Sequence, residues 1–178
     1  AFPAENWRRP IDEVAGLMKL IERAAREQLD AMHDANVRIR VAGRMTDLPA
    51  SLRQALLDGI ERTRHNTGIT FTLAINYGGR AEIVDAVRAL VADGTPPDAI
   101  DEDAISGRLY NPDHPEPDLM IRTAGEMRWS NFLLWQSAYT ELFVTAKSWP
   151  EFSPADLAEA CREYARRTRK FGGVVDVE

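Results

Sequence analysis

Residues 68–79, GITFTLAINYGG, decide the fold, because a stretch rich in β-branched and aromatic residues leads into a pair of glycines. This composition is typical of a strand that ends in a tight turn. The next stretch, residues 81–94, has the apolar spacing of a helix. Before it, residues 49–64 are also helical in pattern, and residues 36–43, NVRIRVAG, alternate apolar residues with arginines at the period of two of a strand. Helices and strands therefore alternate along the chain.

The same alternation continues toward both ends of the sequence. It predicts a long first helix at 10–35, strands at 118–123 and 141–146, a short helix at 130–139 and a capped final helix at 153–173. Because parallel strands need crossover connections, this order favours an α/β fold whose central, mostly parallel sheet is flanked by helices. We expect about six strands, a common sheet size.

The composition limits the functions that the chain can have. With 178 residues, of which 44% are hydrophobic, we expect one domain over residues 1–178. The formal charge of −6 disfavours a non-specific nucleic-acid binder. A single cysteine, Cys161, excludes an internal disulfide and fits a reducing compartment. No apolar run approaches the roughly 18 to 20 residues that cross a bilayer, and we expect a cytoplasmic protein.

Two polar loops follow predicted strands, NYGGR at 76–80 and RTAGEMRWSN at 122–131. In an open α/β sheet, ligands bind at the carboxyl ends of the strands. We therefore expect these loops to contain the site. NYGGR also has a simpler interpretation as a tight turn, for which its glycines are suited.

The second loop has the residue types of an oxyanion site. The planar guanidinium groups of Arg122 and Arg128 suit bidentate capture of phosphate oxygens. Ser130 and the backbone N–H groups at the start of the predicted following helix would add donors. The alternative is a solvated loop whose arginines pair with Glu126 or Asp118. The spacing alone does not choose between them.

Glu141 follows an apolar stretch and has two interpretations. Its carboxylate could bind Mg²⁺ beside a diphosphate, or it could form a structural ion pair or cap. Metal binding through histidine is not expected, because His33, His65 and His114 have no ligand spacing.

Taken together, the motifs resemble those of the cis-prenyltransferases, the undecaprenyl diphosphate synthase family. The similar stretches are AENWRRP at 4–10, NYGGR at 76–80, DLMIRTAGEMRWSNFLLWQSAYTEL at 118–142, SWPEF at 148–152 and RKFGG at 169–173. The 118–142 segment is very specific, and the resemblance covers the whole chain.

This resemblance implies an enzyme that joins isopentenyl diphosphate to an allylic diphosphate, with farnesyl diphosphate the expected primer, forms a new cis double bond and uses Mg²⁺. The expected product is a medium to long Z-polyprenyl diphosphate of the kind used as a cell wall lipid carrier. The family also implies a homodimer, to which the apolar run at 132–144 would contribute, and a loose association with the membrane through the product.

The resemblance also assigns roles to residues. Arg122, Arg128 and Ser130 would hold the head group of isopentenyl diphosphate, and Glu141 would help to place the metal. These roles agree with the chemistry, since a departing diphosphate gains negative charge that arginines and a metal stabilise.

At the N-terminal end, the resemblance assigns roles to three further residues. Asn6 would assist proton removal or orient the substrate, Arg9 would contact the allylic diphosphate, and Trp7 would shape the pocket beside it. The alternative for Trp7 is an ordinary core aromatic, the place that we assign to Trp135.

The family houses its growing product in an apolar tunnel between sheet and helices. The residues expected to line it are Leu17, Ile21, Ala24, Val37, Ile39, Val41, Ile69 and Phe71, with Ile69 near the floor. Periodicity alone is equally consistent with a packed core.

The sequence lacks one family feature. Upstream of the ENW motif, family members carry a phosphate-binding segment with an aspartate that serves Mg²⁺ and catalysis, and nothing in this sequence matches it. The alternatives are therefore a chain whose N-terminal part is missing here, or a shortened, non-catalytic partner subunit of a prenyltransferase. A further alternative is an irregular coupler of two allylic diphosphates.

Overall fold

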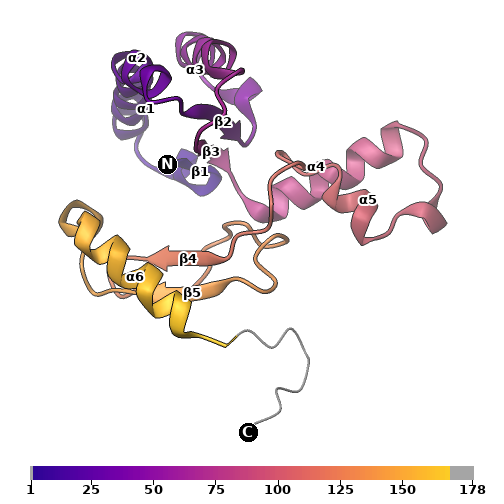
Figure 1. The fold of residues 1–178 in the computed structure, drawn as a ribbon. Helices are drawn as coiled ribbons and strands as arrows, with labels where there is room; N and C mark the ends of the chain where they lie inside the picture. Colours follow the sequence, from indigo (N-terminus) through magenta and orange to yellow (C-terminus); the bar gives the residue numbers. More distant parts are fainter. Residues whose placement is uncertain (1, 169–178) are drawn as a thin grey trace, which may run out of the picture. The chain divides into compact units, whose positions relative to one another are not determined.

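The computed structural model describes residues 2–168 and divides the chain into two compact units, with the boundary after Pro112 (Figure 1). The RKFGG motif at 169–173 lies outside the described residues. Each unit is considered separately below.

The first unit contains a three-stranded parallel sheet in the order β1-β3-β2. Its strands are β1 (Phe2–Pro3), β2 (Arg38–Ala42) and β3 (Thr70–Tyr77). Phe2 lies opposite Ile75, and Ile39 lies opposite Phe71. Because all pairs are parallel, the carboxyl ends of the strands meet at one edge of the sheet.

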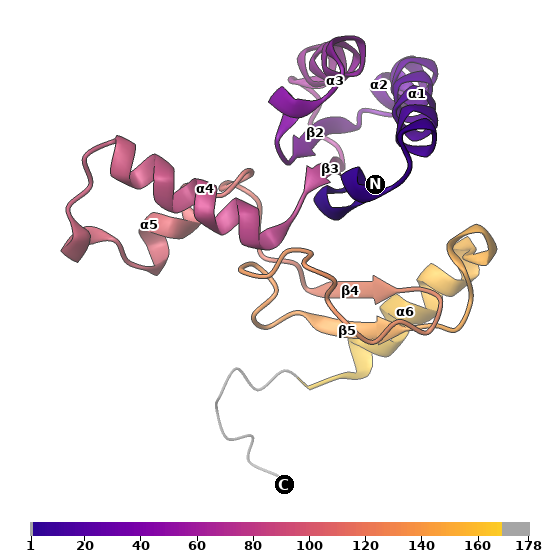
Figure 2. The ribbon, with the colours of Figure 1, turned by 180° about the vertical axis from the view of Figure 1, so that it is seen from behind.

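Three helices pack beside this sheet: α1 (Ile11–Glu27), α2 (Leu29–Asp34) and α3 (Ala50–Thr63). Opposite views show α1 and α3 side by side (Figures 1 and 2). The helix predicted over 10–35 is thus two helices, interrupted at Gln28. The buried core between helices and sheet consists of Phe2, Val14, Met18, Leu48, Leu52, Leu56 and Ile75.

The rest of the first unit is helical. Helix α4 (Gly79–Ala92) follows β3 directly, as predicted, and lies beside the short α5 (Glu102–Ser106) in both views. Short 3-10 helices occur at η1 (Ala4–Arg8), η2 (Met45–Asp47) and η3 (Pro97–Ala99). Neither η1 nor α5 was predicted, since segments this short carry little periodicity.

The second unit contains two parallel strands and one long helix. These are β4 (Leu119–Arg122), β5 (Glu141–Val144) and α6 (Pro154–Arg166), with η4 (Trp149–Glu151) before the helix. A capping box of Ser153 and Asp156 begins α6. The Asp156 carboxylate also bonds Lys147 at 2.6 Å, and the bonds from Lys147 and Ser153 lower its pKa to about 2.

The helix predicted at 130–139 is wrong. This segment consists of turns and bends, and Ser130, Asn131 and Leu133 all have positive φ values. A right-handed helix requires negative φ at every residue, so the apolar spacing there does not reflect a helix. No helix dipole supports the loop that precedes it.

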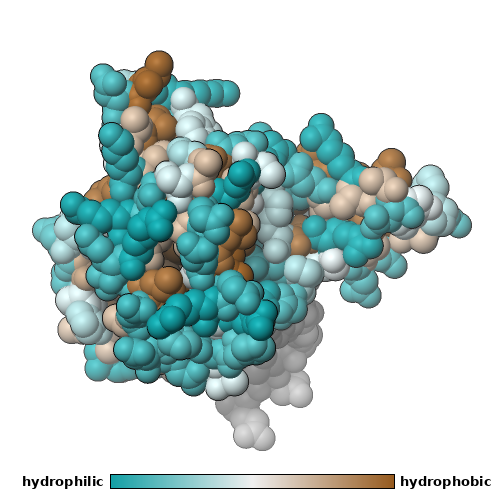
Figure 3. Space-filling model, turned by 90° about the horizontal axis from the view of Figure 1, so that it is seen from above, coloured by the Kyte–Doolittle hydropathy of each residue, from teal (hydrophilic) through white to brown (hydrophobic). Residues whose placement is uncertain are grey.

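The α/β class and the parallel strands are confirmed, and the two sheets in residues 2–168 together hold five strands. One continuous sheet of about six strands stays a prediction. Apolar patches interrupt the hydrophilic surface (Figure 3), and among the exposed large apolar residues are Ile69, Met127 and Trp149. No helix in the described part of the chain is long and apolar enough to cross a membrane.

Gly43, at the end of β2, generates the first prediction. Its φ is +123°, and a Cβ there would lie 2.0 Å from the carbonyl oxygen of Ile75. We expect Gly43→Ala to lower the free energy of unfolding by about 2 to 4 kcal/mol, because both the backbone and the neighbouring carbonyl must move. Urea denaturation measures the change.

The matched control is Gly16→Ala, in the middle of α1. A Cβ there meets nothing within 4 Å, so this variant should gain about 0.5 to 1 kcal/mol from helix propensity. Equal stability of the two variants would contradict the prediction.

Candidate functional site

Three chain segments converge on the carboxyl edge of the three-stranded sheet. The η1 segment follows β1, residues 43–47 follow β2, and residues 76–78 form the end of β3 and the residue after it. The Arg44 amide donates to the carbonyl of Asn76 at 3.2 Å, an approach that the missing side chain of Gly43 permits. The edge therefore brings the NW and NYGGR motifs together, as expected for a site at strand ends.

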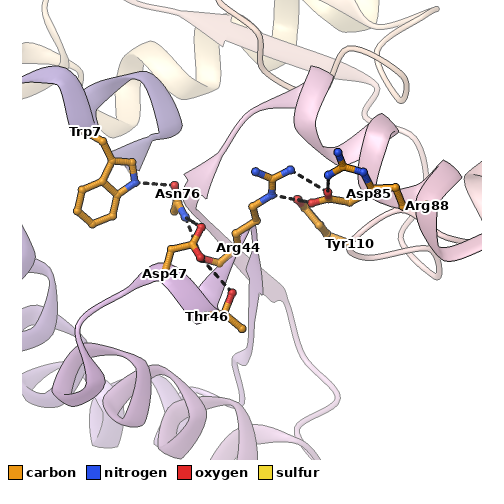
Figure 4. Close-up of polar contacts among 8 residues, drawn as sticks. All are labelled: Trp7, Arg44, Thr46, Asp47, Asn76, Asp85, Arg88 and Tyr110. Atoms are coloured by element: carbon orange, nitrogen blue, oxygen red, sulfur yellow. Dashed lines mark hydrogen bonds and ion pairs between the residues drawn. The ribbon is translucent and has the colours of Figure 1, made fainter. Parts of the chain in front are cut away.

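Asn76 is the centre of the contacts at this edge (Figure 4). Its side-chain oxygen accepts a hydrogen bond from the indole Nε1 of Trp7 at 2.7 Å. Its Nδ2 donates to the carbonyl of Arg44 at 2.9 Å and to Oδ2 of Asp47 at 3.2 Å. The side chain thus joins η1, the segment after β2 and the end of β3.

The Arg44 side chain extends this junction to α4. Its Nε and Nη2 bond the two carboxylate oxygens of Asp85 at 2.7 and 2.8 Å, and the hydroxyl of Tyr110 donates to Asp85 at 2.7 Å (Figure 4). The Arg44 bond holds the pKa of Asp85 below its usual value, and burial raises the pKa of Tyr110. Asp85 is therefore a carboxylate whose oxygens are used inside the protein.

A buried acid lies next to this group. Glu82, in the first turn of α4, is 2% exposed and accepts hydrogen bonds from the hydroxyl of Tyr77 and, at 3.1 Å, from the backbone amide of Tyr110. These bonds account for a carboxyl group in the protein interior.

A cavity of about 420 Å³ opens beside η1. Trp7 and Arg9 both line it, together with Ile11, Val14, Ala15, Met18, Lys19, Glu22, Pro49 and Ser51. Arg9 bonds Glu13 at 2.5 Å, and the carbonyl of the half-buried Asn6 accepts from the Arg9 amide at 3.1 Å. The structure thus brings together Trp7 and Arg9, the two residues predicted to meet the allylic substrate.

A second cavity, of about 250 Å³, lies farther along α1 and is almost wholly apolar. Four of the predicted tunnel residues line it: Ile21, Ala24, Ile39 and Phe71. The others around it are Ala25, Gln28, Met32, Ala55, Leu56, Gly59 and Leu73.

The remaining predicted tunnel residues lie elsewhere. Leu17 and Val41 pack against the core cluster, and Val37 precedes β2 without lining either cavity. Ile69 requires a correction, since it is 74% exposed and lines neither cavity. It has the same parity along the strand as Phe71 and Leu73, but it precedes the first residue of β3, beyond the cover of the helices.

In the second unit, the arginine loop begins at the carboxyl end of β4. Two successive residues with positive φ, Ala124 and Gly125, turn the chain. Their amides donate to the carbonyls of Lys147 and Thr145 at 2.7 and 2.9 Å. The loop is therefore fixed to the segment that follows β5.

Within this loop, the three residues predicted to hold a diphosphate meet around one acid. Arg122 donates from Nη2 to the hydroxyl of Ser130 at 3.4 Å and lies 3.8 Å from Glu126. Arg128 forms a close ion pair with the same oxygen of Glu126. The predicted pairing with Glu126 is thus present. In residues 2–168, however, the buried Nε of Arg122 has no hydrogen-bond acceptor.

Glu141 does not join this cluster. It is the first residue of β5 and lies opposite Leu119, whereas Arg122 lies opposite Val144 at the other end of the pair. Its Oε2 bonds Nη1 of Arg167 at 2.7 Å. At about 3.3 Å per residue, the strand separates Glu141 from the arginine end by roughly 10 Å.

The described residues do not by themselves form a metal site. Among residues 2–168, no group of three or more His, Cys, Asp and Glu side chains could hold a metal ion. Glu141 already has a cation beside it, and Glu126 is paired with two arginines. This arrangement does not fit a metal held by the described side chains alone.

The sequence interpretation placed the NYGGR loop at the site but gave Asn76 no role of its own, and it missed Arg44. Asn76 is the second-last residue of β3, a strand whose carboxyl end lies at the predicted site. Arg44 could have been found in the same way, because it directly follows Gly43 at the carboxyl end of a predicted strand.

Comparisons with known proteins identify the family of the chain. Residues 1–172 match the family model described as "Putative undecaprenyl diphosphate synthase". An isoprenyl transferase of Heliobacterium mobile is 48% identical over 98% of this chain and 68% of its own length. One of Thermotoga maritima is 42% identical over 99% of this chain and 76% of its own length.

Two solved structures are similar as well. One is lavandulyl diphosphate synthase from Lavandula x intermedia in complex with dimethylallyl diphosphate, with a TM-score of 0.92 and 37% identity over 97% of this chain and 76% of that one. The other is a probable undecaprenyl diphosphate synthase from Campylobacter jejuni, with a TM-score of 0.87 and 32% identity over 97% of this chain and 80% of that one. The chain therefore belongs to the undecaprenyl diphosphate synthase family, whose members are cis-prenyltransferases.

Proposed function

We propose that this isoprenyl transferase condenses isopentenyl diphosphate with farnesyl diphosphate and makes a medium to long Z-polyprenyl diphosphate. The observation that carries the proposal is the buried Nε of Arg122, which has no hydrogen-bond acceptor in the described residues. Ser130 and Arg128, in the same loop, provide further donors beside it. A buried donor without a partner costs about 1 to 3 kcal/mol. An oxygen of a bound diphosphate would supply the missing acceptor.

The proposed chemistry uses each group where charge changes. A carbon–carbon bond forms between the two substrates, the diphosphate of the allylic substrate leaves with the electrons of the broken carbon–oxygen bond, and a proton leaves the isopentenyl unit. Arg122, Arg128 and Ser130 hold isopentenyl diphosphate, Arg9 faces the departing diphosphate, and Asn6 orients the proton that is lost. A divalent metal, which the family uses and for which we propose Mg²⁺, would neutralise diphosphate charge.

The length of the product follows from the two cavities. Both lie along α1, the first lined in part by Trp7 and Arg9 and the second almost wholly by apolar residues. We propose that they form a continuous tunnel when the chain grows. Each added isoprene unit buries about five carbons at ~0.8 kcal/mol per CH₂, so growth continues until a wall blocks it.

We propose that the working protein is a single-domain homodimer that meets the membrane only through its product. A cytoplasmic location and a role in supplying a cell wall lipid carrier belong to the same proposal. Light scattering at micromolar concentration tests the dimer, and a monomer would contradict it.

The diphosphate site gives a direct test with Arg128→Ala. Arg128 is 69% exposed at its side chain, so its removal should not unfold the loop. A charge-assisted hydrogen bond is worth roughly 1.5 to 3 kcal/mol, and we expect the KM for isopentenyl diphosphate to rise about 10- to 100-fold. Arg122→Lys, which keeps the charge but loses the planar fork, should raise the KM as well.

Arg162→Ala is the control for this experiment, because Arg162 is an exposed arginine on α6. Its KM should match that of the parent. The proposed role fails if Arg128→Ala and Arg162→Ala give the same KM and the same turnover.

The product length depends on Phe71, which lines the second cavity. We expect Phe71→Ala to shift the products to longer chains, since it removes a wall of the tunnel. Ile69→Ala, two residues earlier and outside both cavities, should leave the product distribution unchanged. Labelled isopentenyl diphosphate with farnesyl diphosphate, followed by sizing of the products, distinguishes the two.

The same assay separates the alternatives. An identical distribution from both variants would place Phe71 in ordinary core. Product formed from allylic diphosphate alone, with isopentenyl diphosphate omitted, would instead indicate irregular coupling of two allylic substrates.

The proposed metal role of Glu141 is tested against its ion pair. If Glu141 helps to place Mg²⁺, Glu141→Gln should raise the Mg²⁺ concentration needed for half-maximal activity, because the amide loses the charge that a metal requires. Arg167→Gln removes only the partner and should leave that concentration in place. Equal losses of stability in both variants, with unchanged metal titrations, would show a structural ion pair instead.

A further inference from the structure

The Asn76 carboxamide is a junction between three chain segments. Asn76 is 5% exposed, and three of the four hydrogen-bonding positions of its amide are used, by Trp7, Arg44 and Asp47. Its φ of +50° lies in the left-handed region, which asparagine tolerates better than most residues. Side chain and backbone therefore both favour asparagine at this position.

Other side chains of similar size do not reproduce these contacts. An aspartate would lose both donors and place a second carboxylate beside Asp47. A leucine would leave the indole N–H of Trp7 and the carbonyl of Arg44 without their partners. Only a short amide combines an acceptor for Trp7 with two donors for the segment after β2.

The indole held by Asn76 forms part of the wall of the first cavity. The Trp7 ring packs edge-on against Phe2, with centroids 5.2 Å apart and an interplanar angle of 74°. Phe2 is buried and would hold the ring in place, but an apolar contact does not fix the rotation of an indole. The 2.7 Å bond to Asn76 provides that direction.

The opposite side of the junction is itself fixed. The Arg44 carbonyl accepts a hydrogen bond from Asn76, while the Arg44 guanidinium donates two hydrogen bonds to Asp85 (Figure 4). The amide of Asn76 thus links Trp7 to a segment that is itself bonded to α4 through Arg44 and Asp85.

We propose that Asn76 is a positioning residue for the allylic substrate, which acts by fixing the rotation of the Trp7 indole at the wall of the cavity that Trp7 shares with Arg9. This inference rests on the proposed function, in which that cavity receives the allylic diphosphate. It adds to that function a residue, Asn76, that affects the substrate only by holding Trp7.

The first measurement needs no substrate. In ¹⁵N-labelled protein, the four tryptophans give indole N–H signals, and the signal that disappears in Trp7→Phe belongs to Trp7. Asn76→Gly removes the amide without straining the left-handed backbone. We expect it to accelerate hydrogen exchange of the Trp7 indole about tenfold and to shift its signal.

The matched control is Asn66→Gly. Asn66 also makes two hydrogen bonds through its Nδ2, here to the backbone carbonyls of Val37 at 2.8 Å and His33 at 3.4 Å, but these contacts lie near the amino end of β2. It should lose stability without changing the Trp7 signal. An unchanged indole in Asn76→Gly, or an equal change in Asn66→Gly, overturns the proposal.

The second measurement is a double-mutant cycle on farnesyl diphosphate affinity by calorimetry. Trp7→Phe keeps an aromatic ring but loses the N–H donor, so both it and Asn76→Gly should raise the Kd about tenfold. If Asn76 acts through Trp7, the double variant is no weaker than the weaker single variant. If the increases in Kd of the two single variants multiply in the double variant, or if Asn76→Gly leaves the Kd unchanged, the positioning role is overturned.

The two measurements separate the inference from the function. A parent protein that binds no farnesyl diphosphate would defeat the proposed function, and with it the substrate role of Asn76. The indole signal would still decide whether Asn76 fixes Trp7.

Discussion

The structure of the first unit depends on the contact between Gly43 and the carbonyl of Ile75. A Cβ at residue 43 would lie 2.0 Å from that oxygen, so the chain leaving β2 can cross the end of β3 only with a hydrogen in this place. The crossing lets the Arg44 amide reach the carbonyl of Asn76 and the Arg44 carbonyl accept from the Asn76 side chain. One steric constraint therefore creates the polar edge on which Trp7 is held.

The regular elements could be predicted because their signals are local. The alternation in 36–43 and the β-branched run in 68–79 both became strands, and the register of β2 with β3 follows from their apolar faces. The segment at 130–139 failed for a physical reason, since apolar spacing carries no information on φ, and three of its residues have positive φ. The prediction for Ile69 is wrong because this residue lies just before β3: its side chain is on the same face as that of Phe71, but it is exposed there.

Contacts between individual site residues were predictable from spacing only where the residues are close in sequence. Arg122 and Ser130 belong to one loop and meet, whereas Trp7 and Asn76 are separated by 69 positions and meet only because β1 pairs with β3. The register also decides the place of Glu141, which motif spacing could not show. Because β4 and β5 are parallel, the first residue of one strand lies far from the last residue of the other.

Charge alone does not identify a ligand site in this acidic chain, since Arg44 and Arg122 both lie beside a carboxylate. Arg44 is gripped by both oxygens of Asp85, so taking up an anion there would require breaking a bidentate pair. Arg122 has a longer approach to its acid, at 3.8 Å, and keeps a buried donor without an acceptor in the described residues. A guanidinium whose donors are used inside the chain stabilises the fold, and one with an unused buried donor is prepared for a ligand. By this criterion Arg44 stabilises the strand edge of the first unit, whereas Arg122 keeps a donor for a ligand in the second.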